Sequence, residues 1–376
     1  MKSKCIYLDN ASTKKIYPEV IKVMQNHMLN IDGNPGSVHK LGEEARNALD
    51  SARKSIADNI RAKAWEIIFT SGATESNNLA LKGLAERYND RKKIIISSIE
   101  HSSIYECCQE LKNKGYDIIE VPVNEKGYLN ISYLENIMDK NTLLVSVIYG
   151  NNEFGTIQDI GRIGKICRDR RVFFHTDAVQ SLGNEKIDVM AMNIDLLSAS
   201  AHKLGGPKGI GFLYLREGID IIPIIQGGGQ EKGRRSGTEN VAGAVGFAKA
   251  LEISVGINKK KVIELREYFI KKLENMNGKI NGSRENRLFN NVNVSFPGLK
   301  AENLLIVLSE RGVMCSTRSA CSEKGKKYNR ILSAIGLDEK DINGTLRFSL
   351  SEYTKRKDID YTLSIISDYL IINKNF

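Results

Sequence analysis

Short aliphatic and β-branched runs alternate with helix-like segments between about residues 65 and 215, and this alternation constrains the fold more than any other feature. The predicted strands are Glu66–Thr70, Lys93–Ser97, Asp117–Val121, Leu143–Ile148, Val172–Asp177, Leu196–Ser200 and Gly211–Leu215. The amphipathic segments between them, predicted as helices, are Glu75–Tyr88, Ser103–Lys114, Ser132–Met138 and Ile160–Arg170. This pattern is typical of the α/β class, with a mostly parallel sheet of seven strands between helices.

The pattern changes further along the chain. One long helix is predicted over roughly Val241 to Asn275, followed by a strand at Val292–Phe296, a helix at Ala301–Arg311 and a strand at Thr345–Leu350. A chain of 376 residues exceeds one small core, so we expect a large domain and a small α+β domain. We assign residues 15–257 to the large domain, and residues 1–14 and 258–376 to the small one.

Composition narrows the class of protein. The content of 41% hydrophobic and 27% charged residues is that of an ordinary globular protein, and no apolar run approaches the roughly 20 residues of a membrane span. The start of the chain lacks the apolar core of a signal peptide. Six cysteines without a C-x-x-C pair, and five histidines without ligand spacing, predict no disulfide scaffold and no resident metal. We therefore expect a cytoplasmic protein.

The net charge of +10 is spread over the whole chain. Diffuse basic charge mostly reflects solvated helix faces, although it also suits tRNA, DNA or an acidic protein partner. The charge by itself decides between none of these.

Several polar residues directly follow predicted strands. These candidates are Gly72–Thr74, His101, Asn152, Asp177 and Ser200–Lys203. In doubly wound sheets, ligands bind beyond the carboxyl ends of the strands, so we expect these side chains to share one site.

Lys203 and Asp177 are the pair that a pyridoxal phosphate enzyme requires. An amine forms the Schiff base, and a carboxylate keeps the pyridine nitrogen protonated. Lysine alone indicates little, because the chain has 55 Lys and Arg residues. The evidence is the segment around it, Ser198 to Gly209, which follows closely after Asp177.

Two further segments suit the phosphate of such a cofactor. Gly72-Ala73-Thr74 reads as a tight turn at a helix start, where free N–H groups favour an anion, although an ordinary capped helix has the same signature. Ser200 and His202 could add donors, and the loop Arg235–Thr238 is also suited to an anion.

Three side chains are candidates for the chemistry itself. His101 could stack on a planar ring and shuttle protons, although a lone histidine is more often structural. The amide of Asn152 could bond a ring oxygen or a substrate carboxylate, or simply form a turn. Cys321 stands in a small, polar and basic segment that favours the thiolate, unlike the helical cysteines Cys107, Cys108 and Cys167.

Taken together, these motifs resemble those of the cysteine desulfurases, pyridoxal phosphate-dependent enzymes related to class V aminotransferases. The matching strings occur in the family's order over nearly the whole chain, at Tyr7–Thr13, Gly33–Ser37, Phe69–Ser76, Glu100–His101, Asn151–Gly155, His175–Ser181, His202–Gly209, Arg235–Thr238, Ser319–Cys321 and Leu346–Ser349. The resemblance implies the type I fold of pyridoxal phosphate-dependent transferases.

The resemblance also implies residue roles. Lys203 would carry the cofactor, Asp177 would bind its pyridine nitrogen, Gln180 its phenolic oxygen, and His101 would stack on the ring and act in catalysis. The phosphate contacts implied are Ala73, Thr74, Ser200 and His202, with Thr238 from the second subunit of a homodimer. The substrate contacts implied are Asn10, Asn152 (also beside the cofactor) and Arg347, whose guanidinium suits a carboxylate.

The implied reaction converts L-cysteine to L-alanine and leaves a persulfide on Cys321. The sulfur would pass to a protein acceptor in iron–sulfur cluster assembly, tRNA thiolation or DNA phosphorothioation, and Cys321 is also a candidate transient iron–sulfur ligand. Direct binding of nucleic acid is not expected. A selenocysteine lyase or an aminotransferase of the same fold is the alternative, as is a non-catalytic sulfur-relay or nucleic-acid-binding subunit.

The chain departs from the family pattern in three places. Arg318 stands where glycine is usual, and it either lowers the pKa of the Cys321 thiol, contacts an anionic acceptor or points into solvent. Ala201 replaces a glycine before His202, a change that we expect to be tolerated. The C-terminus lacks the longer tail by which some relatives engage a scaffold, which puts that partner in doubt.

Overall fold

The computed structural model describes residues 5–317 and 329–373. Within these residues, seven strands form one sheet in the order β2-β8-β7-β6-β5-β3-β4. Their bounds are β2 Ile67–Thr70, β3 Lys93–Ser97, β4 Asp117–Val121, β5 Thr142–Ser146, β6 Phe173–Asp177, β7 Leu196–Ser200 and β8 Gly211–Leu215. β8 runs antiparallel to both of its neighbours and the other pairs are parallel, which confirms the predicted mostly parallel sheet.

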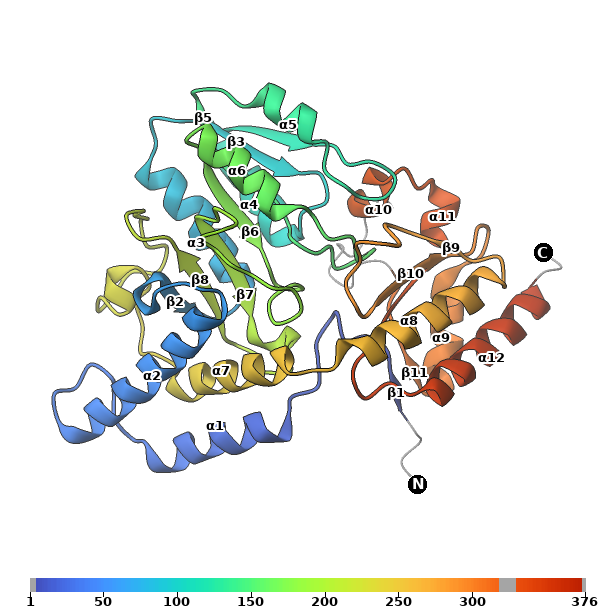
Figure 1. The fold of residues 1–376 in the computed structure, drawn as a ribbon, viewed down its shortest axis with the longest axis horizontal. Helices are drawn as coiled ribbons and strands as arrows, with labels where there is room; N and C mark the ends of the chain where they lie inside the picture. Colours follow the sequence, from blue (N-terminus) through green and yellow to red (C-terminus); the bar gives the residue numbers. More distant parts are fainter. Residues whose placement is uncertain (1–4, 318–328, 374–376) are drawn as a thin grey trace.

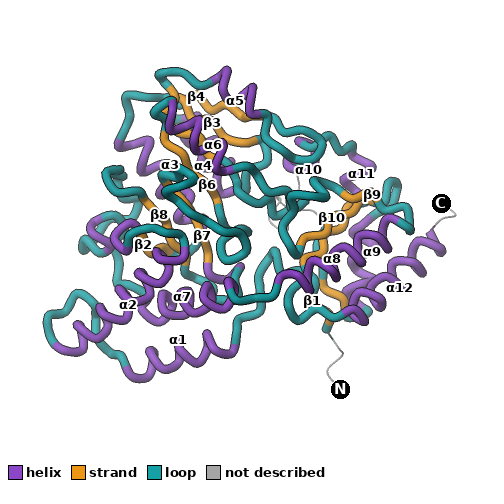
Figure 2. Tube along the Cα trace, viewed as in Figure 1, coloured by secondary structure: helices purple, strands orange, loops and turns teal. Residues whose placement is uncertain are grey.

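Helices cover both faces of this sheet (Figures 1 and 2). Their bounds are α1 Pro18–Asn30, α2 Lys40–Asn59, α3 Ala73–Arg87, α4 Ser102–Asn113, α5 Ile131–Ile137, α6 Ile160–Asp169 and α7 Val241–Val255. Strand side chains alternate between two cores: Phe212 and Tyr214 join the cluster under α1, α2, α6 and α7, whereas Leu213 and Leu215 join the cluster under α3 and α4. This period of two is the physical reason that apolar strands here are buried on both sides.

A smaller unit lies beside the large sheet, and the first and last described elements, β1 and α12, belong to it (Figure 1). Its described sheets are β12-β10-β9 and β1-β11, with bounds β1 Ile6–Tyr7, β9 Lys279–Ile280, β10 Asn291–Ser295, β11 Val313–Met314 and β12 Thr345–Ser349. Its helices are α8 Lys259–Glu274, α9 Ala301–Glu310, α10 Arg330–Ala334, α11 Glu339–Asn343 and α12 Arg356–Asn373. Because β1 pairs with β11, the first residues of the chain share a core with its last third.

The prediction of one continuous helix over Val241–Asn275 was wrong. The structure has two helices there, α7 and α8, bent by 69° at a break. α7 ends at Val255, with Gly256 as its C-cap, and Asn258 caps the start of α8 by accepting a hydrogen bond from the backbone N–H of Lys260. The break passes the chain from the large sheet to the small unit.

No single helix in the described ranges is long and apolar enough to cross a membrane. The bent pair α7 and α8 passes that test jointly, by length and composition only.

Candidate active site

A cavity of about 560 Å³ opens beyond the carboxyl ends of the large sheet's strands, where the sequence predicted it. The sequence-predicted residues that line it are Ala73, Thr74, His101, Asn152, Asp177, Gln180, Ser200, His202, Lys203 and Arg347. The first nine lie at or after the carboxyl ends of strands in the large sheet, or at the start of the helices that follow. Arg347 comes from β12 of the small unit. The site therefore lies between the two units.

Lys203 ends a single 3-10 turn, Ala201–Lys203, that follows β7 without a break. Its Nζ atom donates to the backbone carbonyls of Ala11 and Ser12, at 2.7 and 2.8 Å. The N-terminal segment thus runs along the lysine loop, and Tyr17 N–H donates to Gly205 O at 3.0 Å. The amine is aimed into the cavity by backbone contacts that residues far apart in the sequence provide.

Gly205 lies directly behind this lysine, with φ of +84° and with the Tyr17 ring 2.4 Å from where a Cβ would stand. We expect Gly205→Ala to lower the free energy of unfolding by about 2 kcal/mol or more, because a left-handed backbone strains any other residue and the methyl group meets a ring. Urea unfolding measures this loss. Gly218→Ala is the matched control, since Gly218 has φ of +87° with nothing within 4 Å of its Cβ position. Equal losses in the two variants would contradict the role of the Tyr17 contact.

Asp177 is the last residue of β6 and is buried, with 3% of its surface exposed. Its Oδ1 accepts from the backbone N–H of Val179 at 3.0 Å, and its Oδ2 accepts from the Asn77 amide at 2.9 Å. Gln180 follows on the next turn and donates to Ala11 O at 3.0 Å. A buried carboxylate held in this way suits a protonated ring nitrogen.

The start of α3 lines the same cavity and suits an anion. The first N–H groups of a helix have no partner inside the helix, and those of Ala73 and Thr74 stand at this start. Ser200 Oγ lies close by, 3.8 Å from where a Cβ of Gly72 would stand. Burial and the nearby Lys203 lower the pKa of His202 to about 4, so its imidazole is neutral at pH 7.

His101 caps α4 with its side chain. Its Nδ1 accepts a hydrogen bond from the backbone N–H of Ser103 at 3.2 Å. Burial lowers the pKa of His101, the charges of Lys203 and Arg330 lower it further, and Asp177 opposes the shift. A neutral imidazole facing the cavity can accept or donate a proton during a reaction.

Arg347 is almost fully buried and contacts two carboxylates. Its Nη1 donates to Glu153 Oε1 at 3.0 Å, and its Nη2 donates to Asp9 Oδ1 at 3.2 Å and Ser12 Oγ at 2.8 Å. Glu153 Oε1 also accepts from the Asn152 amide at 2.8 Å. Burial raises the pKa of Glu153, and the charge of Arg347 opposes that shift. Two of the three predicted substrate contacts, Asn152 and Arg347, are therefore joined by one buried carboxylate.

Sequence reasoning gave no role to Glu153, Asn77, Ser103 or Lys208, although all of these except Asn77 line the cavity. Glu153 stands inside the string Asn151–Gly155, next to the selected Asn152, and that position was the available signal. Asn77 lies in the predicted helix Glu75–Tyr88, one residue beyond the string Phe69–Ser76, and nothing in the sequence singled it out. Their partners, Arg347 and Asp177, are about a hundred residues or more away, so no local pattern pointed to the contacts.

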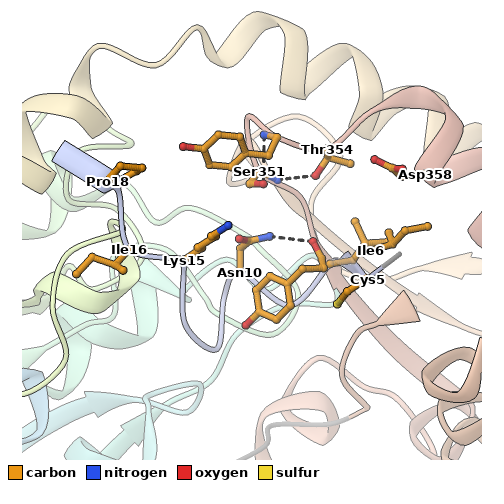
Figure 3. A pocket seen from close by; sticks show the side chains of 12 residues that line it. Cys5, Ile6, Asn10, Lys15, Ile16, Pro18, Ser351, Thr354 and Asp358 are labelled. Atoms are coloured by element: carbon orange, nitrogen blue, oxygen red, sulfur yellow. Dashed lines mark hydrogen bonds between the residues drawn. The ribbon is translucent and has the colours of Figure 1, made fainter. Parts of the chain in front are cut away.

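Among the described residues, Asn10 and Thr238 lie outside this lining. Asn10 borders a separate cavity of about 390 Å³ (Figure 3), and its amide donates to Ser349 O at 2.8 Å. Thr238 is exposed on a loop. Cys321 and Arg318 lie outside the described residues.

The cavity fits pyridoxal phosphate. It brings together a helix start for the phosphate, an amine, a buried carboxylate and an imidazole. In addition, Asn152 Oδ1 is buried with no hydrogen-bond partner among the described residues, as expected of an atom whose partner is a ligand.

Comparisons with known proteins agree with this geometry. The family model described as "Aminotransferase class-V" matches residues 6–362. A protein of Dictyoglomus turgidum named "Cysteine desulfurase IscS" is 43% identical over 96% of this chain and 93% of its own length. The solved structure titled "NIFS-LIKE PROTEIN" is 36% identical, with a TM-score of 0.93 over 98% of this chain and 100% of its own. Another, titled "SspA in complex with cysteine", is 36% identical, with a TM-score of 0.84 over 93% of this chain and 100% of its own.

The chain therefore belongs to the class V aminotransferase family and, within it, to the cysteine desulfurases. The enzymes of this family depend on pyridoxal phosphate, which is the cofactor that the cavity fits.

Proposed function

We propose that this protein converts L-cysteine to L-alanine and carries the sulfur as a persulfide on Cys321, for transfer to a protein acceptor. The observation that supports this most strongly is one cavity containing Lys203, Asp177 and Arg347, one residue each for cofactor attachment, ring charge and substrate carboxylate. When bound, pyridoxal phosphate supplies the electron-withdrawing ring that stabilises negative charge on the substrate Cα.

The protein's own residues would divide the remaining work. Arg347 and Asn152 would hold the substrate carboxylate, which orients the Cα proton toward the amine of Lys203. Asp177 would keep the ring nitrogen charged, and His101 would move a proton at the substrate. The Cys321 thiolate would attack the substrate sulfur, so that an S–S bond forms as the Cβ–S bond breaks. Cysteine plus the enzyme thiol then balances alanine plus the enzyme persulfide.

Contacts on both sides of residues 318–328 support this role for Cys321. Ser316 and Arg347 exchange two backbone hydrogen bonds, at 3.1 and 2.7 Å, so the chain leaves the described part beside the substrate end of the cavity. The described chain resumes at Asn329, and the guanidinium of the next residue, Arg330, donates to the carbonyls of Ser98 and Glu100, next to His101.

The test is to incubate the purified enzyme with L-cysteine and measure alanine and persulfide. We expect Cys321→Ala to abolish persulfide and to slow alanine formation by on the order of 10³-fold, since the nucleophile is lost. Cys5→Ala is the matched control, because Cys5 is an exposed cysteine outside the active-site cavity. Alanine formation that survives Cys321→Ala unaltered would refute the proposed nucleophile. A rate on selenocysteine that far exceeds the rate on cysteine would favour the lyase alternative.

We further propose that the enzyme works as a homodimer in which Thr238 reaches the partner's phosphate site. Thr238 is exposed, and its loop follows a segment with the exposed apolar side chains Ile222, Ile224 and Ile225. Exposed apolar surface of this kind is typical of an interface. Light scattering would give the oligomeric state. Thr238→Ala should weaken cofactor binding while the protein remains a dimer.

Two remaining assignments are also proposals. A division into domains at 15–257 and at 1–14 with 258–376 agrees with the separate cores of the large sheet and the small unit. A reducing, cytoplasmic location is supported by the five cysteines of the described chain, which are all free thiols.

A further inference from the structure

Asn77 lies behind the cavity wall, on α3, and is fully buried. Its Nδ2 atom donates to two acceptors, Asp177 Oδ2 at 2.9 Å and Ser103 Oγ at 2.8 Å. The orientation of this amide follows from chemistry, because the reverse orientation would set the Asn77 carbonyl oxygen against a carboxylate. The Asn77 side chain therefore contacts Asp177 directly and is linked to His101 through the Ser103 hydroxyl.

The hydrogen bonds from Asn77 to His101 have a defined direction. The backbone N–H of Ser103 can only donate, so His101 Nδ1 is an acceptor and the neutral ring carries its proton on Nε2. Ser103 Oγ lies 2.9 Å from the same Nδ1. Because this Nδ1 carries no proton, the Ser103 hydroxyl is the donor in that contact, and its oxygen accepts from Asn77.

We propose that Asn77 is a positioning residue that holds both protein groups flanking the cofactor ring: Asp177 directly, and His101 through Ser103. This inference rests on the proposed function, since it takes Asp177 and His101 as the ring contacts. No other described side chain donates to Asp177. Loss of Asn77 would therefore leave Asp177 with the backbone N–H of Val179 and leave the Ser103 hydroxyl free to turn.

The charged and titratable groups around His101 set the background for this effect. Asp177 lies on β6, Lys203 follows β7 and Arg330 lies on α10. Glu100 precedes His101 and is buried, and burial raises its pKa to about 8. A hydrogen bond to the neutral imidazole lowers the pKa of His101, so removal of the Ser103 hydroxyl should raise it.

The test uses three variants and two readouts. Asn77→Leu removes both contacts, Ser103→Ala removes only the one to His101, and Asn78→Leu is the control, a neighbouring asparagine whose amide donates to Thr74 O. The first readout is the dissociation constant of pyridoxal phosphate, followed by absorbance. The second is the pKa of His101 in cofactor-free protein, by NMR with labelled histidine assigned through His101→Gln.

We expect Asn77→Leu to weaken cofactor binding by roughly tenfold or more, because a hydrogen bond to a charged carboxylate is lost. It should also raise the pKa of His101 by roughly 0.5 to 1. Ser103→Ala should raise that pKa by a similar amount while leaving cofactor affinity within about twofold, and Asn78→Leu should change neither.

An unchanged His101 pKa in Asn77→Leu, or an unchanged cofactor affinity, would overturn the proposal. So would an equal loss of cofactor affinity in Ser103→Ala. Asn77→Ala is measured alongside in case leucine does not fit the buried site, and Ser103→Ala tests the contact to His101 if neither folds. The NMR measurement needs no turnover, so its failure is distinct from a failure to produce alanine.

Discussion

Replacing Lys203 with alanine should leave a folded protein that binds its cofactor without a covalent bond and forms alanine on the order of 10³-fold or more slowly. The reason is that the amine is both the attachment point and the base for the substrate Cα proton. Its Nζ atom donates to two backbone carbonyls, those of Ala11 and Ser12, and neither carbonyl belongs to a side chain that the substitution would leave charged and unpaired.

Borohydride reduction followed by peptide mapping measures the attachment directly. The wild-type enzyme should carry the reduced cofactor on the peptide that contains Lys203, and Lys203→Ala should carry none. Lys54→Ala is the control, because Lys54 is exposed on α2 and pairs with Asp58 at 2.7 Å. A label that moves to another lysine without loss of activity would contradict the assignment.

Replacing Arg347 with methionine should have the largest effect on stability. Glu153 is fully buried, and removal of one partner of a buried ion pair costs about 3–5 kcal/mol because the other charge is left uncompensated. The same change should raise the KM for cysteine by roughly 30-fold or more, since the substrate carboxylate loses its cation.

The double variant Arg347→Met with Glu153→Gln separates the two effects. It should recover much of the lost free energy of unfolding, because the fully buried side chain at position 153 then carries no charge, while the KM for cysteine stays high. Urea unfolding and steady-state kinetics measure the two quantities. If the single variant were as stable as the wild type, the pairing of Glu153 with Arg347 would not be energetically important.

The large sheet was predictable because its signals are local. Four strands, at 93–97, 117–121, 196–200 and 211–215, have the predicted bounds, and the others differ by one or two residues at their ends. The short strands of the small unit at 279–280 and 313–314 were not predicted, since two-residue strands carry no periodicity. The helix break at Asn258 was missed because asparagine also occurs inside helices and acts as a cap only in context.

The residues expected to bind the cofactor could likewise be predicted from the sequence. Each of them follows a strand or starts a helix, and a few neighbouring residues are enough to show this. The sequence by itself determined the doubly wound sheet and the lysine, aspartate and histidine at its edge. Tertiary structure alone decided that Glu153 joins Asn152 to Arg347, that Asn77 joins Asp177 to Ser103, and that Asn10 borders a different cavity. The contact of Glu153 with Arg347 depends on how the two units pack, and the contacts of Asn77 depend on how α3 and α4 pack on the large sheet. Because the partners lie as many as 195 residues apart, no local pattern encodes them.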